Sequence, residues 1–204
     1  FNFNERIRIN GEESPDSRII KSFEFVEEAR DSVQMTYFEF STLAAIHLLS
    51  ESNLDIVILE VGLGGRLDAV NVVEPDISIL TNVQLDHQDW LGNNLEMIAK
   101  EKSAIFRKGK PAIIGERNSP ISVTKEIERL EARPYKLGKD FDLDIDTIKK
   151  KWSYEFHALD KDISIPNIKL TNLSPESASV AITAFLLLGE KIDSENKKVL
   201  ENTQ

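Results

Sequence analysis

The chain has 204 residues, enough for one large domain, and its apolar share of 41% is ordinary for a globular protein. A formal net charge of −10 without a long run of lysine and arginine argues against a nucleic-acid partner. The absence of cysteine excludes disulfides, thiolate catalysis and cysteine-bound zinc. No apolar run approaches the ~20 residues that span a bilayer, so we expect no membrane partner and a cytoplasmic location.

The first part of the sequence is predicted to form a short strand and two helices. Glu5–Asn10 alternates charged and apolar residues and ends in an Asn-Gly turn, which is typical of a strand. Apolar residues then recur at helical spacing from Pro15 to Arg30. Thr36 can cap a second helix, and the apolar residues of that helix occupy most of its sides, so we expect it to be buried.

Two short apolar runs, Asp55–Val61 and Asp76–Val83, are predicted as buried parallel strands, and polar, irregular sequence follows each of them. In an open α/β sheet, ligands bind at the carboxyl ends of the strands. Glu60 closes the first run and His87 follows the second. We therefore expect a carboxylate and an imidazole to meet at one cleft.

The alternation of strands and helices continues, which predicts βαβ crossovers and an α/β fold with a mostly parallel sheet flanked by helices. The further elements expected in this part are a helix at 94–106, a strand at 111–115, a helix at 123–132 and a strand at 134–137. Alternation with period two then predicts a small region of shorter, more exposed strands at 141–148, 152–158 and 163–170. Two further helices are expected at 173–188 and 194–200.

Among the ionisable residues, Glu60 is a candidate metal ligand. A carboxylate at the end of an apolar strand must be paired, solvated or metal-bound, and its oxygens suit Mg²⁺. His87, beside Asp86, is placed as a ligand or an acid–base group, and a loop histidine without a role is the alternative. His47 is expected to be a hydrogen-bonded core residue, and His157 an exposed strand residue that needs no function.

The loop after the first run offers weaker signals. Its G-L-G-G sequence fits either a ligand contact or a tight structural turn. For Arg66 and Asp68, a local ion pair or a turn cap is favoured over substrate recognition. Lys102, further along, is by default a solvated helix lysine, but partial burial would let its neutral amine react with CO₂ to form a carbamate.

Three longer motifs carry a resemblance. They read E-V-G-L-G-G-R-L-D-A-V-N from Glu60, D-H-Q-D-W-L-G-N-N from Asp86, and I-A-K-E-K-S-A-I-F-R-K-G-K-P-A-I from Ile98. Together they closely resemble the folylpolyglutamate synthase/dihydrofolate synthase family, within the Mur-ligase-like ATP-dependent amide ligases. N-E-R-I-R-I-N-G and T-Y-F-E-F also fit, and the resemblance is dense to about Gly115 and sparser beyond it.

The resemblance implies a Mur-ligase-like central ATPase domain that ligates L-glutamate to dihydropteroate or folates. In this chemistry ATP converts a substrate carboxylate into an acyl phosphate, which the amine of L-glutamate attacks, and Mg²⁺ neutralises and orients the phosphates. By position, Glu60 and His87 match Mg²⁺ ligands, and Lys102 matches a lysine that becomes carbamylated. Catalytic roles for His87 and Lys102, small-molecule substrates and a monomeric protein are the corresponding expectations.

Two stretches match positions that contact dihydropteroate in the resembled family. The first lies at the start of the predicted second helix and comprises Thr36, Tyr37, Phe38 and Glu39. The second follows the glycines and comprises Leu67, Asp68 and Ala69. The resemblance implies that an aromatic ring of the first stretch packs on the pterin and that Asp68 hydrogen-bonds its edge.

The sequence also departs from the family's pattern. The phosphate-binding G-T-N-G-K-G-S loop and the family's Ser-Pro-His are absent, and Ser177 stands where the family has an asparagine that contacts the nucleotide. The chain begins at Phe1 without methionine and ends at Gln204 after a helical pattern. We therefore interpret residues 1–204 as a partial ATPase domain that is inactive alone, without its phosphate-loop portion and a C-terminal glutamate-binding domain. A processed chain, another Mur-type ligase and a non-catalytic module with the same fold are the alternatives.

Overall fold

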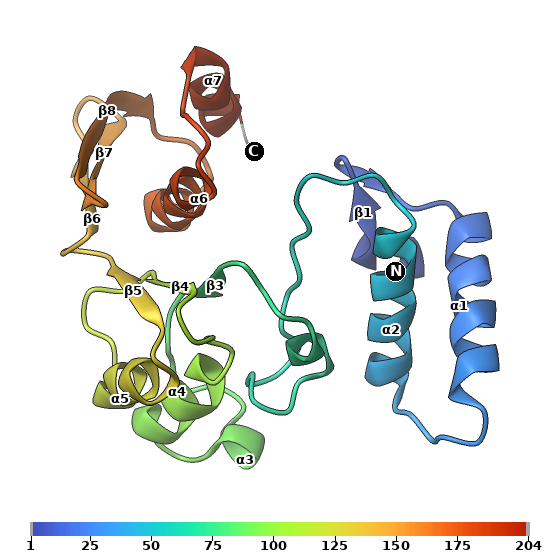
Figure 1. Cartoon of the computed structure of the whole chain (residues 1–204). Coiled ribbons are helices and arrows are strands. Elements are labelled where there is room, and N and C mark those ends of the chain that lie inside the picture. Colours follow the sequence, from blue (N-terminus) through green and yellow to red (C-terminus); the bar gives the residue numbers. More distant parts are fainter. Residues whose placement is uncertain (1, 203–204) are drawn as a thin grey trace. The chain divides into compact units, whose positions relative to one another are not determined.

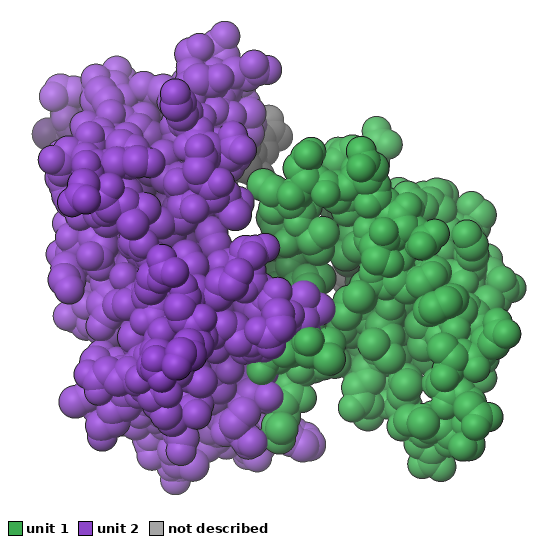
Figure 2. Space-filling view, viewed as in Figure 1, with its two compact units in different colours: residues 1–63, 67–72 green, residues 64–66, 73–204 purple. Residues whose placement is uncertain are grey.

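The computed structural model describes residues 2–202, and the chain divides into two compact units. The first unit comprises residues 1–63 and 67–72, and the second comprises residues 64–66 and 73–204 (Figure 2). The ends that the sequence predicts to be cuts, Phe1 and Gln204, lie outside the described residues.

The first unit begins with a 3₁₀ helix, η1 (Phe3–Arg6), and a hairpin of two antiparallel strands, β1 (Arg8–Ile9) and β2 (Glu12–Glu13). The hairpin turn is Asn10–Gly11, with positive φ values of 53° and 83°, which asparagine and glycine tolerate best. The predicted strand Glu5–Asn10 is therefore right only in its second half, because its first residues belong to the 3₁₀ helix.

Two helices, α1 (Asp16–Arg30) and α2 (Tyr37–Ser50), pack against each other in this unit (Figure 1). α2 begins as predicted at Thr36, whose hydroxyl accepts a hydrogen bond from the N–H of Glu39 while the Glu39 carboxylate accepts one from the N–H of Thr36. The prediction that α2 is buried is wrong, since Phe38 is 40% exposed and Leu43 36%. A helix is buried only where a neighbour covers it, and within this unit only one stripe of α2 is covered.

The segment Asp55–Val61 is not a strand. It runs without regular secondary structure, and most of its apolar residues are exposed, Ile58 to 82%. The prediction of a buried strand is therefore wrong. A strand needs a hydrogen-bonded neighbour, and no sheet formed within residues 2–202 includes this segment. A short 3₁₀ helix, η2 (Ala69–Val72), follows the glycine-rich loop.

The second unit contains a parallel sheet in the order β3-β4-β5, formed by β3 (Ser78–Leu80), β4 (Pro111–Ile114) and β5 (Arg133–Lys136). This sheet confirms the predicted parallel arrangement, in which helices connect successive strands. β3 is shorter than the predicted Asp76–Val83, because its pairing with β4 extends only from Ser78 to Leu80.

Helices cover one face of the parallel sheet (Figure 1). α4 (Leu95–Ser103) and α5 (Ile121–Leu130) pack there, and the one-turn helix α3 (Gln88–Leu91) precedes α4. α4 begins where the sequence predicts, because Asn94 Oδ1 accepts a hydrogen bond from the N–H of Met97. Buried side chains between this face and its helices include Leu80, Ile98, Phe106, Ile114 and Val123.

The other face of the sheet meets α6 (Pro175–Leu187), which also contacts an antiparallel sheet of β6 (Phe141–Asp146), β7 (Lys151–Ala158) and β8 (Lys161–Lys169). The predicted alternation is confirmed, and so is the greater exposure, because most residues of these strands are exposed or half-buried. The expectation that they are shorter is wrong, since they have 6, 8 and 9 residues, against 3, 4 and 4 in the parallel sheet. The buried minority packs on α6, and β7 contributes three alternate residues to it, Trp152, Tyr154 and Phe156.

The last helix, α7 (Ser194–Asn202), lies against β8. Both C-terminal helices therefore fall close to their predicted positions. Within residues 2–202, no helix has the length and apolar character needed to cross a bilayer.

Candidate functional site

In the first unit, Asp68 caps the glycine-rich loop. Its Oδ2 accepts hydrogen bonds from the N–H groups of Gly62 at 3.1 Å and Leu63 at 2.9 Å. Its Oδ1 accepts one from the N–H of Val70 at 2.9 Å. The turn-cap interpretation of Asp68 is confirmed, and the carboxylate holds together the two sides of the loop. A carboxylate can accept about four hydrogen bonds, so the cap leaves room for one more donor.

The aromatic ring of Phe38 packs directly on this loop. A Cβ atom built at Gly62 would lie 2.6 Å from Cζ of Phe38, so glycine leaves space for the ring in this position and a larger residue would displace it. The contact brings the first turn of α2 beside the loop that Asp68 caps. The two stretches that were predicted separately to contact substrate, Thr36–Glu39 and Leu67–Ala69, therefore belong to one region of the first unit.

The side chains of this region differ in what they can offer a ligand. Thr36 and Glu39 are engaged with each other in the helix cap, and those hydrogen bonds lower the pKa of the Glu39 carboxyl. Tyr37 and Phe38 present exposed ring surface, and Leu67 is 81% exposed. The accessible surface is therefore mainly apolar and aromatic, with Asp68 as its acceptor. Direct contact between these residues and a substrate stays a prediction.

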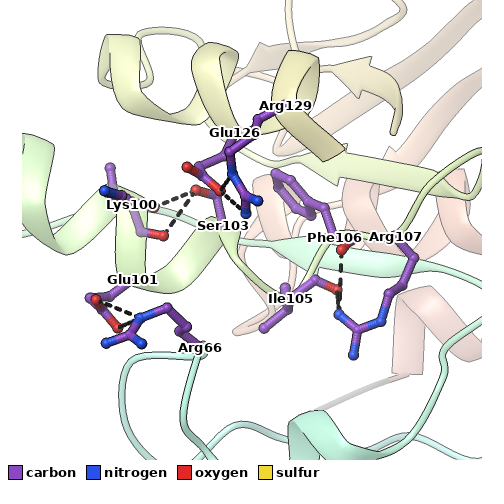
Figure 3. Close-up of polar contacts among 10 residues, drawn as sticks. Arg66, Lys100, Glu101, Ser103, Ile105, Phe106, Arg107, Glu126 and Arg129 are labelled. Carbon is purple, nitrogen blue, oxygen red and sulfur yellow. Dashed lines mark hydrogen bonds and ion pairs between the residues drawn. The ribbon is translucent and has the colours of Figure 1, made fainter. Parts of the chain in front are cut away.

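In the second unit, the loop residue Arg66 lies beside the last turn of α4 (Figure 3). The backbone of Gly65 is close to the carbonyl groups of the same turn. The N–H of Arg66 donates to the carbonyl oxygen of Glu101 at 3.1 Å. Its Nε donates to both carboxylate oxygens of Glu101, at 3.0 and 3.1 Å. Arg66 thus forms an ion pair, but the prediction of a local partner is wrong, because Glu101 belongs to α4 and lies 35 residues away in the sequence.

Lys102 follows Glu101 in the last turn of α4. It is half-buried, as the neighbouring apolar residues suggested. Its carbonyl oxygen would lie 2.9 Å from a Cβ atom at Gly65, so the glycine loop touches the backbone that carries this lysine. A cation also interacts favourably with the C-terminal end of a helix. The carbamate and the catalytic role of Lys102 stay predictions.

His87 starts α3 in a left-handed backbone conformation, with φ of 50° and ψ of 39°. Its N–H donates to Asp86 Oδ1 at 2.8 Å, and its Nε2 lies 3.5 Å from Asp86 Oδ2. A non-glycine residue in this conformation is strained, and such residues often occur at functional sites. Asp86 thus orients an imidazole that remains exposed, as a ligand or an acid–base group requires.

Glu60 lies exposed at the end of the extended segment in the first unit, and His87 belongs to the second. An accessible carboxylate and an accessible imidazole can both coordinate a divalent cation such as Mg²⁺ or Mn²⁺. The residue types therefore fit the predicted metal. Within residues 2–202, no three or more His, Asp or Glu side chains gather around a common point suited to a metal ion. The assignment of Glu60 and His87 as metal ligands stays a prediction.

The other two histidines have structural partners. The His47 ring stacks on Phe25 at 3.9 Å between centroids, and its Nδ1 lies 3.1 Å from the hydroxyl of Ser22. His47 joins α2 to α1 through the predicted hydrogen bond, but it is half-buried, so the prediction of a core residue is wrong. His157 lies between Asp162 and Glu155, and both carboxylates raise the pKa of its imidazole.

Sequence reasoning missed Glu116, which follows β4. Its Oε2 accepts a hydrogen bond from the N–H of Val83 at 3.3 Å, which joins the exits of two parallel strands. Its Oε1 is buried without a hydrogen-bond partner among the described residues, and burial raises the pKa of this carboxyl. The signal that singled out Glu60, a carboxylate just beyond an apolar run, is also present at Glu116.

At the start of α6, Ser177 is exposed, and its N–H donates to the hydroxyl of Ser174, the helix cap. It lies in the first turn of the helix, where the resembled family places its asparagine. A nucleotide contact at Ser177 stays open as a prediction.

Comparisons with known proteins show which family this chain is similar to. The profile of the Mur ligase middle domain family matches residues 18–178. The dihydrofolate synthase/folylpolyglutamate synthase of Escherichia coli K12 is 38% identical over 194 residues, which cover 95% of this chain and 44% of the relative. The protein of the same name from Haemophilus influenzae is 36% identical over 203 residues, covering 99% and 45%.

Solved structures lead to the same family. A structure of E. coli FolC in complex with DHPP and ADP superimposes with a TM-score of 0.90 and 34% identity, covering 99% of this chain and 47% of that one. A bifunctional folylpolyglutamate synthase/dihydrofolate synthase from Yersinia pestis, complexed with AMPPNP and Mn ion, gives 0.90 and 33%, covering 100% and 48%. The chain spans less than half the length of these relatives. Because the family profile covers most of its residues, the chain belongs to the Mur ligase middle domain family.

Proposed function

We propose that this chain is part of an ATP-dependent ligase that joins L-glutamate to dihydropteroate, to folates, or to both. The observation that carries the proposal is the convergence of the family motifs at two places. In the first unit the start of α2 meets the loop capped by Asp68, and in the second unit Gly65 and Arg66 meet the turn of α4 that carries Lys102. Relatives that match 95% and 99% of this chain bear the name dihydrofolate synthase/folylpolyglutamate synthase.

The proposed reaction has two steps. An oxygen of the pteroate or folate carboxylate attacks the γ-phosphorus of ATP, and ADP leaves, which gives an acyl phosphate. The amine of L-glutamate then attacks the acyl carbon, inorganic phosphate leaves and the amine loses a proton, so that an amide forms. A bound Mg²⁺ would neutralise phosphate charge in this chemistry. The protein's part is to position the reactants and to stabilise charge.

The residues of the chain take distinct roles in this proposal. The exposed rings of Tyr37 and Phe38 provide a surface on which a flat pterin can pack, and the remaining acceptor capacity of Asp68 suits an N–H at its edge. The flanking Leu67 and Ala69 complete this substrate-binding stretch. Solved relatives hold DHPP with ADP, or Mn and AMPPNP with L-glutamate, which supports ligands of these classes.

The charged residues would act on the phosphates. Glu60 and His87 would hold Mg²⁺, with His87 oriented by Asp86. The neutral amine of Lys102 would attack CO₂ and lose a proton, which gives a carbamate with the charge of a carboxylate. That group would support a second metal ion or the γ-phosphate.

We also propose that these 204 residues are part of a longer protein. Residues 1–204 would form a partial ATPase domain, and the phosphate loop and the glutamate-binding domain would come from other parts of a longer chain. We expect the 204 residues alone to be inactive. A monomeric, cytoplasmic enzyme is the corresponding proposal for the whole protein.

The decisive experiment uses the full-length protein. Purified enzyme is incubated with ATP, Mg²⁺, L-glutamate and either dihydropteroate or a reduced folate, and both ADP and the glutamylated product are measured. We expect product and ADP in equal amounts, and loss of both in the variant Glu60→Ala. Glu51→Ala, at the exposed end of α2, is the matched control and should keep the activity.

Other outcomes would select the alternatives. Normal ligation by Glu60→Ala would contradict the assignment of this residue. Turnover of a nucleotide-sugar substrate, with none of dihydropteroate or folate, would identify another Mur-type ligase. Absence of ADP release with every substrate would favour a non-catalytic module with the same fold.

A further inference from the structure

The glycine-rich loop contributes three residues, 64–66, to the second unit, while the residues on both sides belong to the first. Within the second unit these residues contact the last turn of α4 at very short range. A Cβ atom at Gly65 would lie 2.7 Å from the carbonyl oxygen of Glu101 and 2.9 Å from that of Lys102. Glycine is therefore required at position 65 for the loop backbone to reach the helix.

A backbone hydrogen bond fixes the direction of this approach. The N–H of Arg66 donates to the carbonyl oxygen of Glu101 at 3.1 Å. Carbonyl groups in the last turn of a helix lack a donor within the helix, so a donor from outside satisfies one of them. The positive charge of Arg66 is also favourable at this end of the helix.

The side chains of Arg66 and Glu101 form a second interaction between the loop and the helix. Arg66 Nε lies 3.0 and 3.1 Å from the two carboxylate oxygens of Glu101, and the two side chains face each other (Figure 3). The side chain of Arg66 is 53% exposed and that of Glu101 27%. An ion pair so exposed contributes little to the free energy of unfolding. Its effect is instead to select one geometry of the loop on the helix.

We propose that Arg66 and Glu101 form a clasp that positions Lys102 for the phosphate chemistry. Lys102 is the next residue after Glu101, so any shift of the loop on this turn moves the backbone of the lysine. Arg66 is a positioning residue in this inference, acting through Glu101, and needs no contact with the pterin. The inference rests on the proposed function, because it assigns Lys102 to the transfer of phosphate.

The test compares Arg66→Gln and Glu101→Gln in the full-length enzyme. Each variant should lower kcat by about tenfold or more, because small displacements of a catalytic group have large kinetic effects. The KM for dihydropteroate should stay close to that of the unaltered enzyme. The double variant should be no worse than either single one, since both remove the same contact. Thermal unfolding should change little in all of them.

Three further variants separate positioning from other roles. Arg66→Lys keeps the charge without the Nε–H and should restore part of kcat. Arg66→Glu combined with Glu101→Arg should do better than either of its single changes. Lys108→Gln removes another exposed ion pair of this unit, with Glu131 at 2.7 Å, and should leave kcat unchanged.

Two results would overturn the clasp while leaving the proposed function intact. The first is unchanged kcat in both glutamine variants of an enzyme that ligates glutamate. The second is a raised KM for dihydropteroate in Arg66→Gln alone, which would mean that Arg66 binds substrate. If the unaltered full-length enzyme ligates no glutamate, the proposed function fails and the clasp fails with it. Should Arg66→Gln not fold, the lysine and charge-swap variants decide.

Discussion

The ring of Phe38 and the backbone of Gly62 are in contact so close that a Cβ atom at Gly62 would lie 2.6 Å from Cζ of the ring. Gly62 does not have a left-handed φ, so the effect of a side chain there is steric, and its nearest contacts would be with the ring of Phe38. The ring lies at the start of α2, and the loop beneath it is held by Asp68. One glycine thereby joins the two stretches that the sequence predicts to bind substrate.

Gly62→Ala should displace the ring of Phe38 and weaken binding of the pterin. Loss of one aromatic contact corresponds to roughly a 3- to 10-fold rise in the KM for dihydropteroate. The free energy of unfolding should change by less than about 1 kcal/mol, because the ring can turn aside. Steady-state kinetics of the full-length enzyme and urea unfolding measure the two effects.

The control for this prediction is the same change in a background without the ring. In Phe38→Leu, which already lacks the aromatic contact, adding Gly62→Ala should raise KM little further. Equal effects of Gly62→Ala in both backgrounds would mean that the ring and the loop act independently, and the interpretation of this contact would be wrong.

Local chemistry made much of the fold predictable. Asn94 and Thr36 cap their helices through their own side chains, and Pro111–Ile114 is a strand because an apolar run of that length is buried from both sides. Asp55–Val61 has the same apolar character, but a strand also requires a hydrogen-bonded neighbour, which a run of residues does not specify. The predicted burial of α2 was wrong for a related reason, since the composition of a helix does not say which of its sides a neighbour covers.

In the candidate site, too, the contacts between residues close in sequence could be predicted, and those between distant residues could not. Asp68 was predicted as a turn cap because its partners lie within a few residues, and Asp86 beside His87 was visible for the same reason. The partner of Arg66 lies in α4, 35 residues away, and that of Glu116 lies 33 residues away. Only the fold brings such residues together, so spacing in the sequence could not reveal these contacts.

Glu116 gives a prediction about pH. Burial raises the pKa of its carboxyl above the ordinary value of 4.5. The folded state therefore holds this proton more tightly than the unfolded state, and stability falls as pH rises from 4.5 through the raised pKa. Glu116→Gln cannot ionise, so its stability relative to the unaltered protein should increase between pH 4 and pH 7. Urea unfolding at a series of pH values measures this difference.

The matched control for Glu116→Gln is Glu128→Gln, on the exposed side of α5. That change should shift stability equally at both ends of the pH range. A Glu116→Gln variant with the same pH dependence as the unaltered protein would contradict the raised pKa. The hydrogen bond from Val83, which lowers the pKa of this carboxyl, would then fully offset the effect of burial.

The buried hydroxyl groups of Tyr154 and Thr183 give a prediction about stability. They lie 2.9 Å apart, and Thr183 Oγ1 also donates to the carbonyl oxygen of Ser179 at 2.8 Å. Both residues are fully buried, where β7 packs on α6. Since the threonine hydrogen is used by Ser179, the tyrosine donates to Thr183. Removal of the Tyr154 hydroxyl and removal of the Thr183 hydroxyl should therefore lower the free energy of unfolding by different amounts.

Tyr154→Phe removes a donor and leaves Thr183 satisfied by Ser179, so it should cost about 1 kcal/mol. Thr183→Val leaves the phenol donor of Tyr154 buried without an acceptor and should cost about 1–3 kcal/mol, because an unmade buried hydrogen bond is more costly than a deleted one. Urea unfolding, followed by the fluorescence of the buried Trp152, measures both. Thr183→Ser keeps both hydrogen bonds and should be the mildest of the three, whereas a larger loss in Tyr154→Phe than in Thr183→Val would reverse the assigned donor.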